Sequence, residues 1–135
     1  MTTPETSQAP VLHRVKPGDC ELAYFERHPE LAGRGPTLFL VHATGFHARV
    51  WDQIIARLPR VHSIALDQRG HGRSEKKPLL HWRSAGEDQA ALLRALDLTN
   101  VVGVGHSMGA HGMIDAAAMC TERFRRLLLI DPVVA

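Results

Sequence analysis

The sequence predicts an α/β fold: a mostly parallel sheet with an N-terminal antiparallel hairpin at one edge and helices on both faces. Short apolar runs alternate with segments of helical periodicity, and continuous apolar runs are typical of parallel strands that are covered on both sides. Two further runs that precede them are joined by a Pro-Gly turn, which favours a hairpin. The 135 residues, of which 44% are hydrophobic, suffice for one domain with one core.

The hairpin is expected first, because the runs 11–15 and 21–26 flank the sequence Lys16-Pro17-Gly18-Asp19. Pro sets φ for a turn, and Gly accepts conformations that other residues avoid. The preceding segment, Met1 to Pro10, is rich in Pro, Thr and Ser and is expected to be a flexible tail. It has neither the basic segment nor the apolar run of a signal peptide. Residues 11–135 therefore form the expected domain.

Parallel strands and helices are expected to alternate after the hairpin. The strands are predicted at 37–41, 63–66, 100–104 and 126–130, and the helices at 50–58, 84–96 and 108–120. Ser84 and Glu87 have the spacing of a capping box, in which two side chains satisfy free backbone amides at the start of a helix. We therefore expect the second helix to begin at Ser84. Its apolar stripe is expected to comprise Ala91, Leu92, Ala95 and Leu96.

Charge and composition argue against several classes of function. Lys+Arg 16 against Asp+Glu 14 gives a net charge of +2, too balanced for a nucleic-acid or anionic-membrane surface. No apolar run reaches the ~18 residues that a membrane span requires. Cys20 and Cys120 form no C-x-x-C, so neither a zinc ribbon nor a disulfide scaffold is indicated, and a cytoplasmic location is expected. The 9 His show no metal-ligand spacing, so no metal site is expected.

The residues after each parallel strand are the candidates for a site, because open parallel sheets bind ligands beyond the carboxyl ends of their strands. The most informative segment is Gly105-His106-Ser107-Met108-Gly109, a G-x-S-x-G sequence between a predicted strand and a predicted helix. A sharp turn there raises the Ser above the sheet, and the Gly residues leave room for neighbouring backbone. Ser107 is therefore the candidate nucleophile, at a helix N-terminus that favours developing negative charge.

A second turn, His42-Ala43-Thr44-Gly45-Phe46, follows the first parallel strand. Its backbone amides are expected to face the Ser107 oxygen, beside the amide of Met108. Two amides in this arrangement would form an oxyanion hole. We expect His42 to anchor its loop through hydrogen bonds rather than to act as a base.

A third segment, Asp67-Gln68-Arg69-Gly70-His71-Gly72-Arg73-Ser74, follows the second parallel strand. Its glycines suit a tight loop. We expect Asp67 to brace this loop, with Arg69 or Arg73 nearby.

In this order, the three segments resemble the N-terminal half of the α/β-hydrolase family, which has an H-G-x-P-like turn, a D-x-R-G-x-G-x-S loop and a G-x-S-x-G nucleophile elbow. The resemblance extends over residues 11–135. It implies a serine hydrolase that works through an acyl-enzyme on a small-molecule substrate and needs no cofactor. It also implies that the amides of Thr44 and Met108 hold the oxyanion. Ala43 stands where the family usually has Gly, which is a mild departure.

A larger departure concerns the acid and the base. In the family the acid usually follows a later strand and the catalytic His follows the last strand, whereas none of the 9 His lies after residues 126–130. We therefore expect a truncated α/β-hydrolase fold that lacks the C-terminal portion with the lid and the catalytic His and is nearly inactive by itself. Some members place the acid after this strand, which makes Asp131 a candidate acid. Asp-Pro is also a common way to end a strand.

Other functions stay open. Gly103, Gly105 and Gly109 follow a strand and open a helix, and Asp131 ends the next strand, as in a dinucleotide-binding site. That fingerprint normally occupies the first strand-helix unit, whereas here two units and a hairpin precede it. A non-catalytic fragment or remnant of the fold is another possibility. The same half-fold serves carbon–carbon bond hydrolases, thioesterases and cofactor-free peroxidases, while Ser rather than Asp at the elbow disfavours dehalogenases. The oligomeric state is not indicated.

Overall fold

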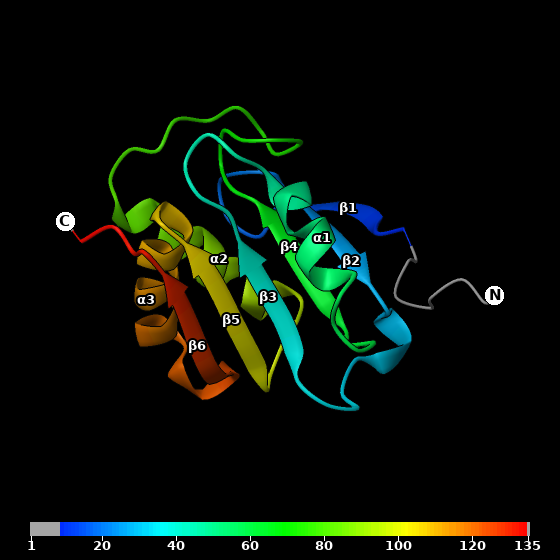
Figure 1. Cartoon of the computed structure of the whole chain (residues 1–135). Helices are drawn as coiled ribbons and strands as arrows, with labels where there is room; N and C mark the ends of the chain where they lie inside the picture. Colours follow the sequence, from blue (N-terminus) through cyan, green and yellow to red (C-terminus); the bar gives the residue numbers. More distant parts are fainter. Residues whose placement is uncertain (1–8, 135) are drawn as a thin grey trace.

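The computed structural model describes residues 9–134, so the tail predicted from Met1 to Pro10 lies mostly outside the described residues. The described chain forms a mixed sheet with helices on both faces, as predicted (Figure 1). Its strands are β1 (Val11–Val15), β2 (Leu22–Arg27), β3 (Thr37–Val41), β4 (Ser63–Asp67), β5 (Val101–His106) and β6 (Phe124–Ile130). Between residues 9 and 134, no helix is both long enough and apolar enough to cross a membrane.

The strand order is β1-β2-β4-β3-β5-β6, which places β3 between β4 and β5. β1 pairs with β2, and β2 with β4, in antiparallel fashion, which confirms the predicted hairpin at one edge. β3 pairs with β4 and β5, and β5 with β6, in parallel. The carboxyl ends of β3, β4 and β5 therefore lie side by side, and the three motif-bearing loops leave the sheet at the same end (Figure 1).

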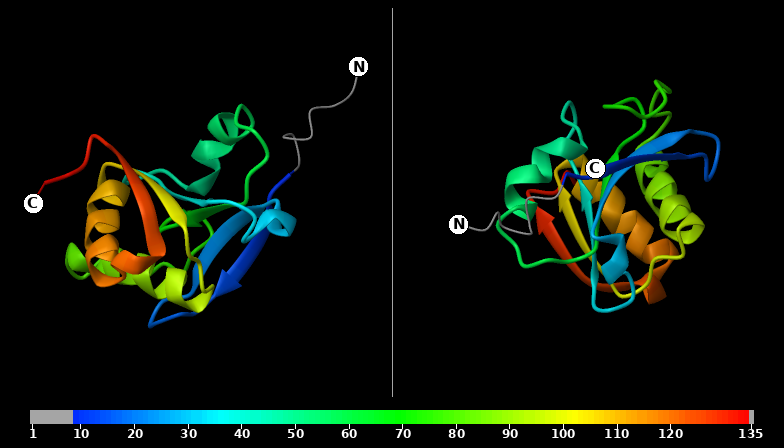
Figure 2. Two further views of the ribbon diagram at one scale, coloured as in Figure 1. Left: turned by 90° about the horizontal axis from the view of Figure 1, so that it is seen from below. Right: turned by 90° about the vertical axis from the view of Figure 1, so that its right-hand side faces the viewer.

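The helices lie in two layers around the sheet. They are α1 (Asp52–Ile55), α2 (Arg83–Ala95) and α3 (Met108–Met119), with short 3₁₀ turns η2 (Pro29–Leu31), η3 (Ala48–Trp51) and η4 (Thr121–Arg123). α2 and α3 cover one face, and η3 and α1 cover the other (Figure 2). Side chains alternate along each strand, so Phe39 and Val41 join the core under α2 and α3, whereas Leu40 packs with Trp51 and Ile55. Both faces of the central strands are thus buried, as the apolar runs predict.

The predicted capping box at the start of α2 is wrong. α2 begins at Arg83, one residue before Ser84, and no side chain caps it. The Ser84 amide donates to the His81 carbonyl at 3.0 Å, so the backbone of the preceding loop already satisfies this donor. The apolar stripe is also only partly as predicted, because Leu92 is buried whereas Ala95 is exposed.

The helix predicted at 50–58 is shorter than expected and partly 3₁₀. It is replaced by η3 and α1, after which the Leu58 amide donates to the Ile55 carbonyl at 3.1 Å in a tighter turn. Pro59 contributes to this ending, because it has no N–H to donate to the Ile55 carbonyl four residues earlier. Trp51 and Ile55 are nevertheless buried, as their helical spacing predicts.

β6 is the outermost strand on its side of the sheet. Its apolar side chains are poorly covered: Leu128 is 57% exposed and Ile130 is 41% exposed. An apolar strand at an open edge is a surface prone to pairing with other strands.

Candidate active site

Ser107 lies at the junction of β5 and α3. Its φ of 54° and ψ of −115° fall outside the regions that L-residues ordinarily adopt, so the backbone is strained. The Ser107 amide donates to the Ile130 carbonyl at 3.0 Å, and the Ser107 carbonyl accepts from the His111 amide at 3.0 Å. Neighbours on both sides therefore hold the strained conformation. The side chain is half-buried and makes no capping bond to α3.

Close backbone contacts require both glycines that flank Ser107. A Cβ added at Gly105 would lie 2.8 Å from the Ala110 amide nitrogen, and a Cβ added at Gly109 would lie 2.4 Å from the Val41 carbonyl oxygen. α3 therefore approaches β3 and β5 too closely for any side chain at these two positions. This packing is what allows the sharp turn at Ser107.

The turn after β3 ends beside this junction. The Phe46 amide donates to the Ala43 carbonyl at 3.1 Å, and Gly45 has a φ of 84°. A hydrogen bond from the fourth residue to the first, with a positive φ at the third residue, is typical of a type II turn. Thr44 is the second residue of this turn. Within the range 9–134, the amides of Thr44 and Met108 have no hydrogen-bond acceptor. Both amides remain available to a ligand.

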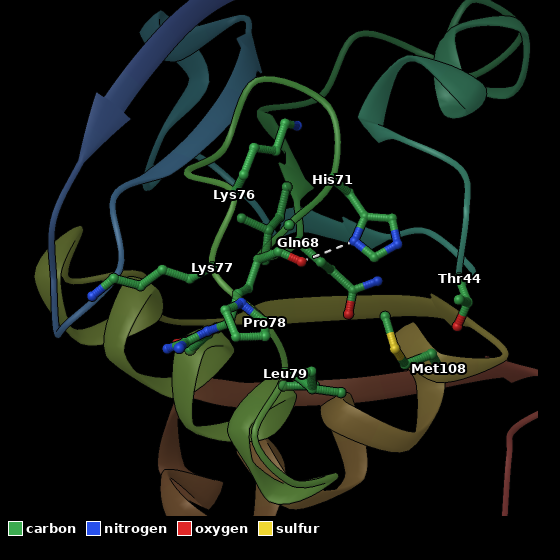
Figure 3. Close-up of a pocket in the computed structure, with 13 residues that line it drawn as sticks. Thr44, Gln68, His71, Lys76, Lys77, Pro78, Leu79 and Met108 are labelled. Atoms are coloured by element: carbon green, nitrogen blue, oxygen red, sulfur yellow. Dashed lines mark hydrogen bonds and ion pairs between the residues drawn. The ribbon is translucent and has the colours of Figure 1, made fainter.

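A cavity of about 450 Å³ opens beside Thr44 and Met108. These two residues lie at one end of it, near the imidazole of His71 (Figure 3). Lys76 and Lys77 belong to its lining, but their ammonium groups point away from that end and donate to backbone carbonyls (Figure 3). Apolar lining residues include Leu66, Pro78 and Leu79. The end next to Thr44 therefore suits an uncharged group.

His42 anchors the loops after β3 and β4, as expected. Its side chain is fully buried, with Nδ1 2.7 Å from the Ala43 carbonyl and Nε2 3.0 Å from the Gln68 amide. A carbonyl only accepts and an amide only donates, so Nδ1 carries the proton and Nε2 is the acceptor. Burial lowers the pKa of His42 from 6.5 to about 4. The ring is therefore neutral at neutral pH, and both of its nitrogens are engaged.

The buried His42 ring is expected to make stability depend on pH. Its pKa is lower in the folded protein than in the unfolded chain, so the unfolded chain takes up a proton first as the pH falls from 6.5 towards about 4. We expect His42 to remove about 3 kcal/mol from the free energy of unfolding across this window, since one pKa unit corresponds to about 1.4 kcal/mol.

Urea denaturation of the wild type and of His42→Asn at several pH values across this window measures the effect. We expect the variant to be less stable at neutral pH and to have a flatter pH dependence. An equally steep dependence in the variant would show that other groups cause the acid sensitivity.

Asp67 braces the loop after β4 through backbone amides. Its buried carboxylate accepts from the Ala48 amide at 2.6 Å and from the Arg73 amide at 2.8 Å. The same carboxylate leaves no room for a side chain at Gly72, because a Cβ added there would lie 2.3 Å from it. Asp67 therefore has the expected bracing role, although the neighbouring arginine contributes its amide and not its guanidinium.

Sequence reasoning missed two residues of this loop. The guanidinium of Arg69 donates to Asp88 on α2 at 2.9 Å and to Asp19 in the β1–β2 turn at 2.6 Å. His71 accepts from the Gly45 amide at 3.0 Å and joins the loop after β4 to the turn after β3. Neither connection follows from spacing, because the partners are far apart in the sequence and meet only in the folded sheet.

Asp131 follows β6 at the same end of the sheet as Ser107. Its φ is 45° and its side chain is exposed. In the part of the chain that the structure describes, neither a histidine nor a carboxylate is hydrogen-bonded to the Ser107 side chain. The described residues thus bring Thr44 and Met108 to the lining of one cavity, whereas Ser107, adjacent to Met108 in the sequence, is not among the residues that line it. They place no acid or base in contact with the Ser107 hydroxyl. The same residues contain no cluster of three or more His, Cys, Asp or Glu that could hold a metal ion.

Comparisons with known proteins agree with this architecture. A family model described as "Alpha/beta hydrolase family" matches residues 38–135. The chain is 35% identical over 101 residues to 2-(acetamidomethylene)succinate hydrolase of Mesorhizobium japonicum, a match that covers 73% of this chain and 36% of that protein. It is 36% identical over 106 residues to N-formylmaleamate deformylase of Pseudomonas putida, covering 76% of this chain and 40% of that protein.

A solved structure is similar over nearly the whole chain. The haloalkane dehalogenase DatA of Agrobacterium tumefaciens matches with a TM-score of 0.82 over 97% of this chain and 45% of that chain, at 23% identity. At this identity the likeness concerns the fold alone. The chain spans less than half the length of each of these three proteins.

Proposed function

The chain belongs to the α/β-hydrolase family, and from this premise we propose that it supplies the nucleophile and the oxyanion hole of a serine hydrolase acting on esters or related acyl bonds. The observation that carries the proposal is the strained turn at Ser107, with φ 54° and ψ −115°, between glycines that allow no side chain. Strain of this kind costs about 1–3 kcal/mol and clusters at active sites. Relatives named as a hydrolase and a deformylase support hydrolysis as the reaction class. Family membership also favours this function over the dinucleotide alternative.

In the proposed reaction, Ser107 Oγ attacks the carbonyl carbon of the substrate while its proton passes to a general base. The carbonyl oxygen becomes an oxyanion that accepts hydrogen bonds from the amides of Thr44 and Met108. The Met108 amide lies in the first turn of α3, whose dipole adds to this stabilisation. The leaving group departs with the proton from the base, and an acyl group stays on Ser107. Water activated by the same base then releases the acid.

We propose that the general base comes from outside residues 9–134. His42 and His71 are poor bases here because both ring nitrogens of each are hydrogen-bonded. Asp131, at the end of β6, stays a candidate for the acid that orients the base. "Complete enzyme" below means residues 1–135 together with the segment that supplies this base. Loss of the base lowers turnover on the order of 10⁶-fold in such triads, so the 135-residue chain alone is expected to be nearly inactive.

The residue at the elbow distinguishes acyl transfer from halide displacement. A serine oxygen forms an acyl-enzyme that water can hydrolyse, whereas the family members that displace halide resemble this fold but carry Asp at the elbow. The similarity to a haloalkane dehalogenase therefore does not carry its reaction to this chain. The uncharged end of the cavity beside Thr44 supports a small-molecule substrate with a neutral acyl group.

We further propose a cytoplasmic location. Cys20 and Cys120 are both free and buried, which supports a reducing environment. Burial raises the pKa of both thiols, so they are expected to be unreactive at neutral pH.

Deleting the Thr44 amide hydrogen tests the oxyanion hole. Proline is common at the second position of a type II turn, so Thr44→Pro is expected to keep the turn while it removes the donor. We expect kcat of the complete enzyme for p-nitrophenyl acetate to fall on the order of 10²–10³-fold, with little change in KM. Steady-state kinetics measures both constants.

Thr44→Ala is the matched control, because it keeps the amide and removes only an exposed side chain. It is expected to have close to wild-type kcat. Wild-type kcat in Thr44→Pro would contradict the assignment of this amide.

A further inference from the structure

Two histidines connect the loops after β3 and β4. Each belongs to one of the two loops and accepts a hydrogen bond from a backbone amide of the other. His42, just after β3, accepts from the Gln68 amide in the loop after β4 at 3.0 Å. His71, in the loop after β4, accepts from the Gly45 amide in the turn after β3 at 3.0 Å. The ring centroids lie 5.1 Å apart. The two loops are therefore fastened to each other at two adjacent points.

The hydrogen bonds of His71 determine which ring nitrogen carries the proton. Nδ1 lies 2.9 Å from the Arg69 carbonyl, which can only accept (dashed line in Figure 3). Nε2 lies 3.0 Å from the Gly45 nitrogen, whose amide can only donate. His71 is therefore neutral with its proton on Nδ1, and Nε2 is the acceptor for Gly45.

The Gly45 amide is adjacent to the amide that is proposed to hold the oxyanion. Thr44, Gly45 and Phe46 are all exposed, and inside the turn the Phe46 amide donates to the Ala43 carbonyl. In the described part of the chain, His71 is the side chain that accepts from an amide of this turn, while the His42 ring donates to the Ala43 carbonyl at its start. The peptide unit is planar, so fixing the Gly45 amide fixes the whole unit between Thr44 and Gly45 and restricts the unit before it.

We propose that His71 is a positioning residue that holds this turn so that the Thr44 amide faces the oxyanion. The inference rests on the proposed function of that amide. An oxyanion-hole donor is effective because it is already oriented before the charge develops. Without the hydrogen bond to His71, the turn is expected to adopt other conformations part of the time, in which the Thr44 amide does not point at the oxyanion. Loss of the His71 acceptor is therefore expected to lower kcat and to leave KM nearly unchanged.

Hydrogen exchange tests the anchor in the 135-residue chain, without any need for catalysis. His71→Leu removes the acceptor and keeps apolar bulk, whereas His71→Gln keeps an acceptor oxygen. We expect the Gly45 amide, followed by NMR, to exchange about tenfold faster in His71→Leu and at close to the wild-type rate in His71→Gln. The amides of β5 report global unfolding and are expected to be unchanged. Unchanged Gly45 exchange in His71→Leu would overturn the proposal.

A measurement on the wild type covers the case in which His71→Leu does not fold. A hydrogen bond between two nitrogens transmits a scalar coupling, here between the Gly45 nitrogen and His71 Nε2. We expect this coupling in the ¹⁵N-labelled chain, together with the ring shifts of an Nδ1-protonated imidazole. Its absence would overturn the proposed anchor.

Kinetics of the complete enzyme tests the positioning role. We expect His71→Leu to lower kcat about tenfold with KM little changed, and His71→Gln to recover most of kcat. His81→Leu is the matched control, because His81 is exposed and lies outside this cavity. A change in KM at constant kcat would overturn the positioning role.

The two proposals fail separately. If Ser107→Ala retains activity, the proposed function is wrong and the role of the Thr44 amide falls with it, while Gly45 exchange still decides whether His71 holds the turn. If Ser107→Ala is inactive and His71→Leu is fully active, the positioning role alone is wrong.

Discussion

Alanine in place of Ser107 is expected to abolish ester hydrolysis by the complete enzyme, with a fall in kcat on the order of 10⁶-fold. The reason is that alanine lacks the oxygen that is proposed to attack the carbonyl carbon. The fold should persist, because the strained φ of 54° is held by hydrogen bonds from the Ser107 backbone and not by its side chain. Circular dichroism and thermal melting check the fold, and p-nitrophenyl acetate checks the activity.

Two further variants sharpen this test. Ser84→Ala removes a buried serine hydroxyl on α2 and is expected to keep full activity. Ser107→Gly is expected to be as inactive as Ser107→Ala but more stable by about 1 kcal/mol, because glycine adopts a positive φ without strain. Hydrolysis at the wild-type rate in either Ser107 variant would refute the nucleophile.

A methyl group at Gly109 is expected to have the largest effect on stability. The added Cβ would lie 2.4 Å from the Val41 carbonyl oxygen and 2.5 Å from the His42 carbonyl oxygen. Both oxygens belong to backbone that is fixed by the sheet and by the buried His42 ring, so α3 must move instead. We expect Gly109→Ala to lose about 3 kcal/mol or more of unfolding free energy and, because Ser107 moves with α3, its activity as well.

Gly18→Ala is the control for this substitution, since a Cβ there meets nothing within 4 Å. It is expected to change stability by only about 0.5 kcal/mol. Urea denaturation compares the two variants. If Gly109→Ala is as stable as Gly18→Ala, the close approach of α3 to β3 does not exist in solution.

The strands could be predicted because their signal is local. The run 37–41 is continuous, apolar and bounded by a loop, and it coincides with β3 (Thr37–Val41). The start of α2 could not be predicted in the same way, because the His81 carbonyl that accepts from the Ser84 amide takes its position from the course of the preceding loop. Pro59 did carry a local signal for the early end of the helix predicted at 50–58, because a proline cannot donate to the carbonyl four residues before it.

The same distinction between local and long-range signals applies to the candidate site. The elbow at Ser107 is contained in a few consecutive residues, so its place between a strand and a helix could be predicted. The bond from the Gly45 amide to His71 joins two loops whose proximity depends on the pairing of β3 with β4. The spacing of Gly45 and His71 in the sequence does not indicate this bond. The residues that orient the proposed oxyanion donor therefore become visible only in the folded chain.

Covalent labelling with a fluorophosphonate is the most direct test of Ser107 as the nucleophile. The 135-residue chain is treated with the probe, with imidazole added as a general base, and the modified residue is mapped by mass spectrometry. We expect modification at Ser107, slower modification in Thr44→Pro, and no modification at this position in Ser107→Ala. Labelling that is confined to other residues, or that proceeds equally in Ser107→Ala, would contradict the proposed nucleophile.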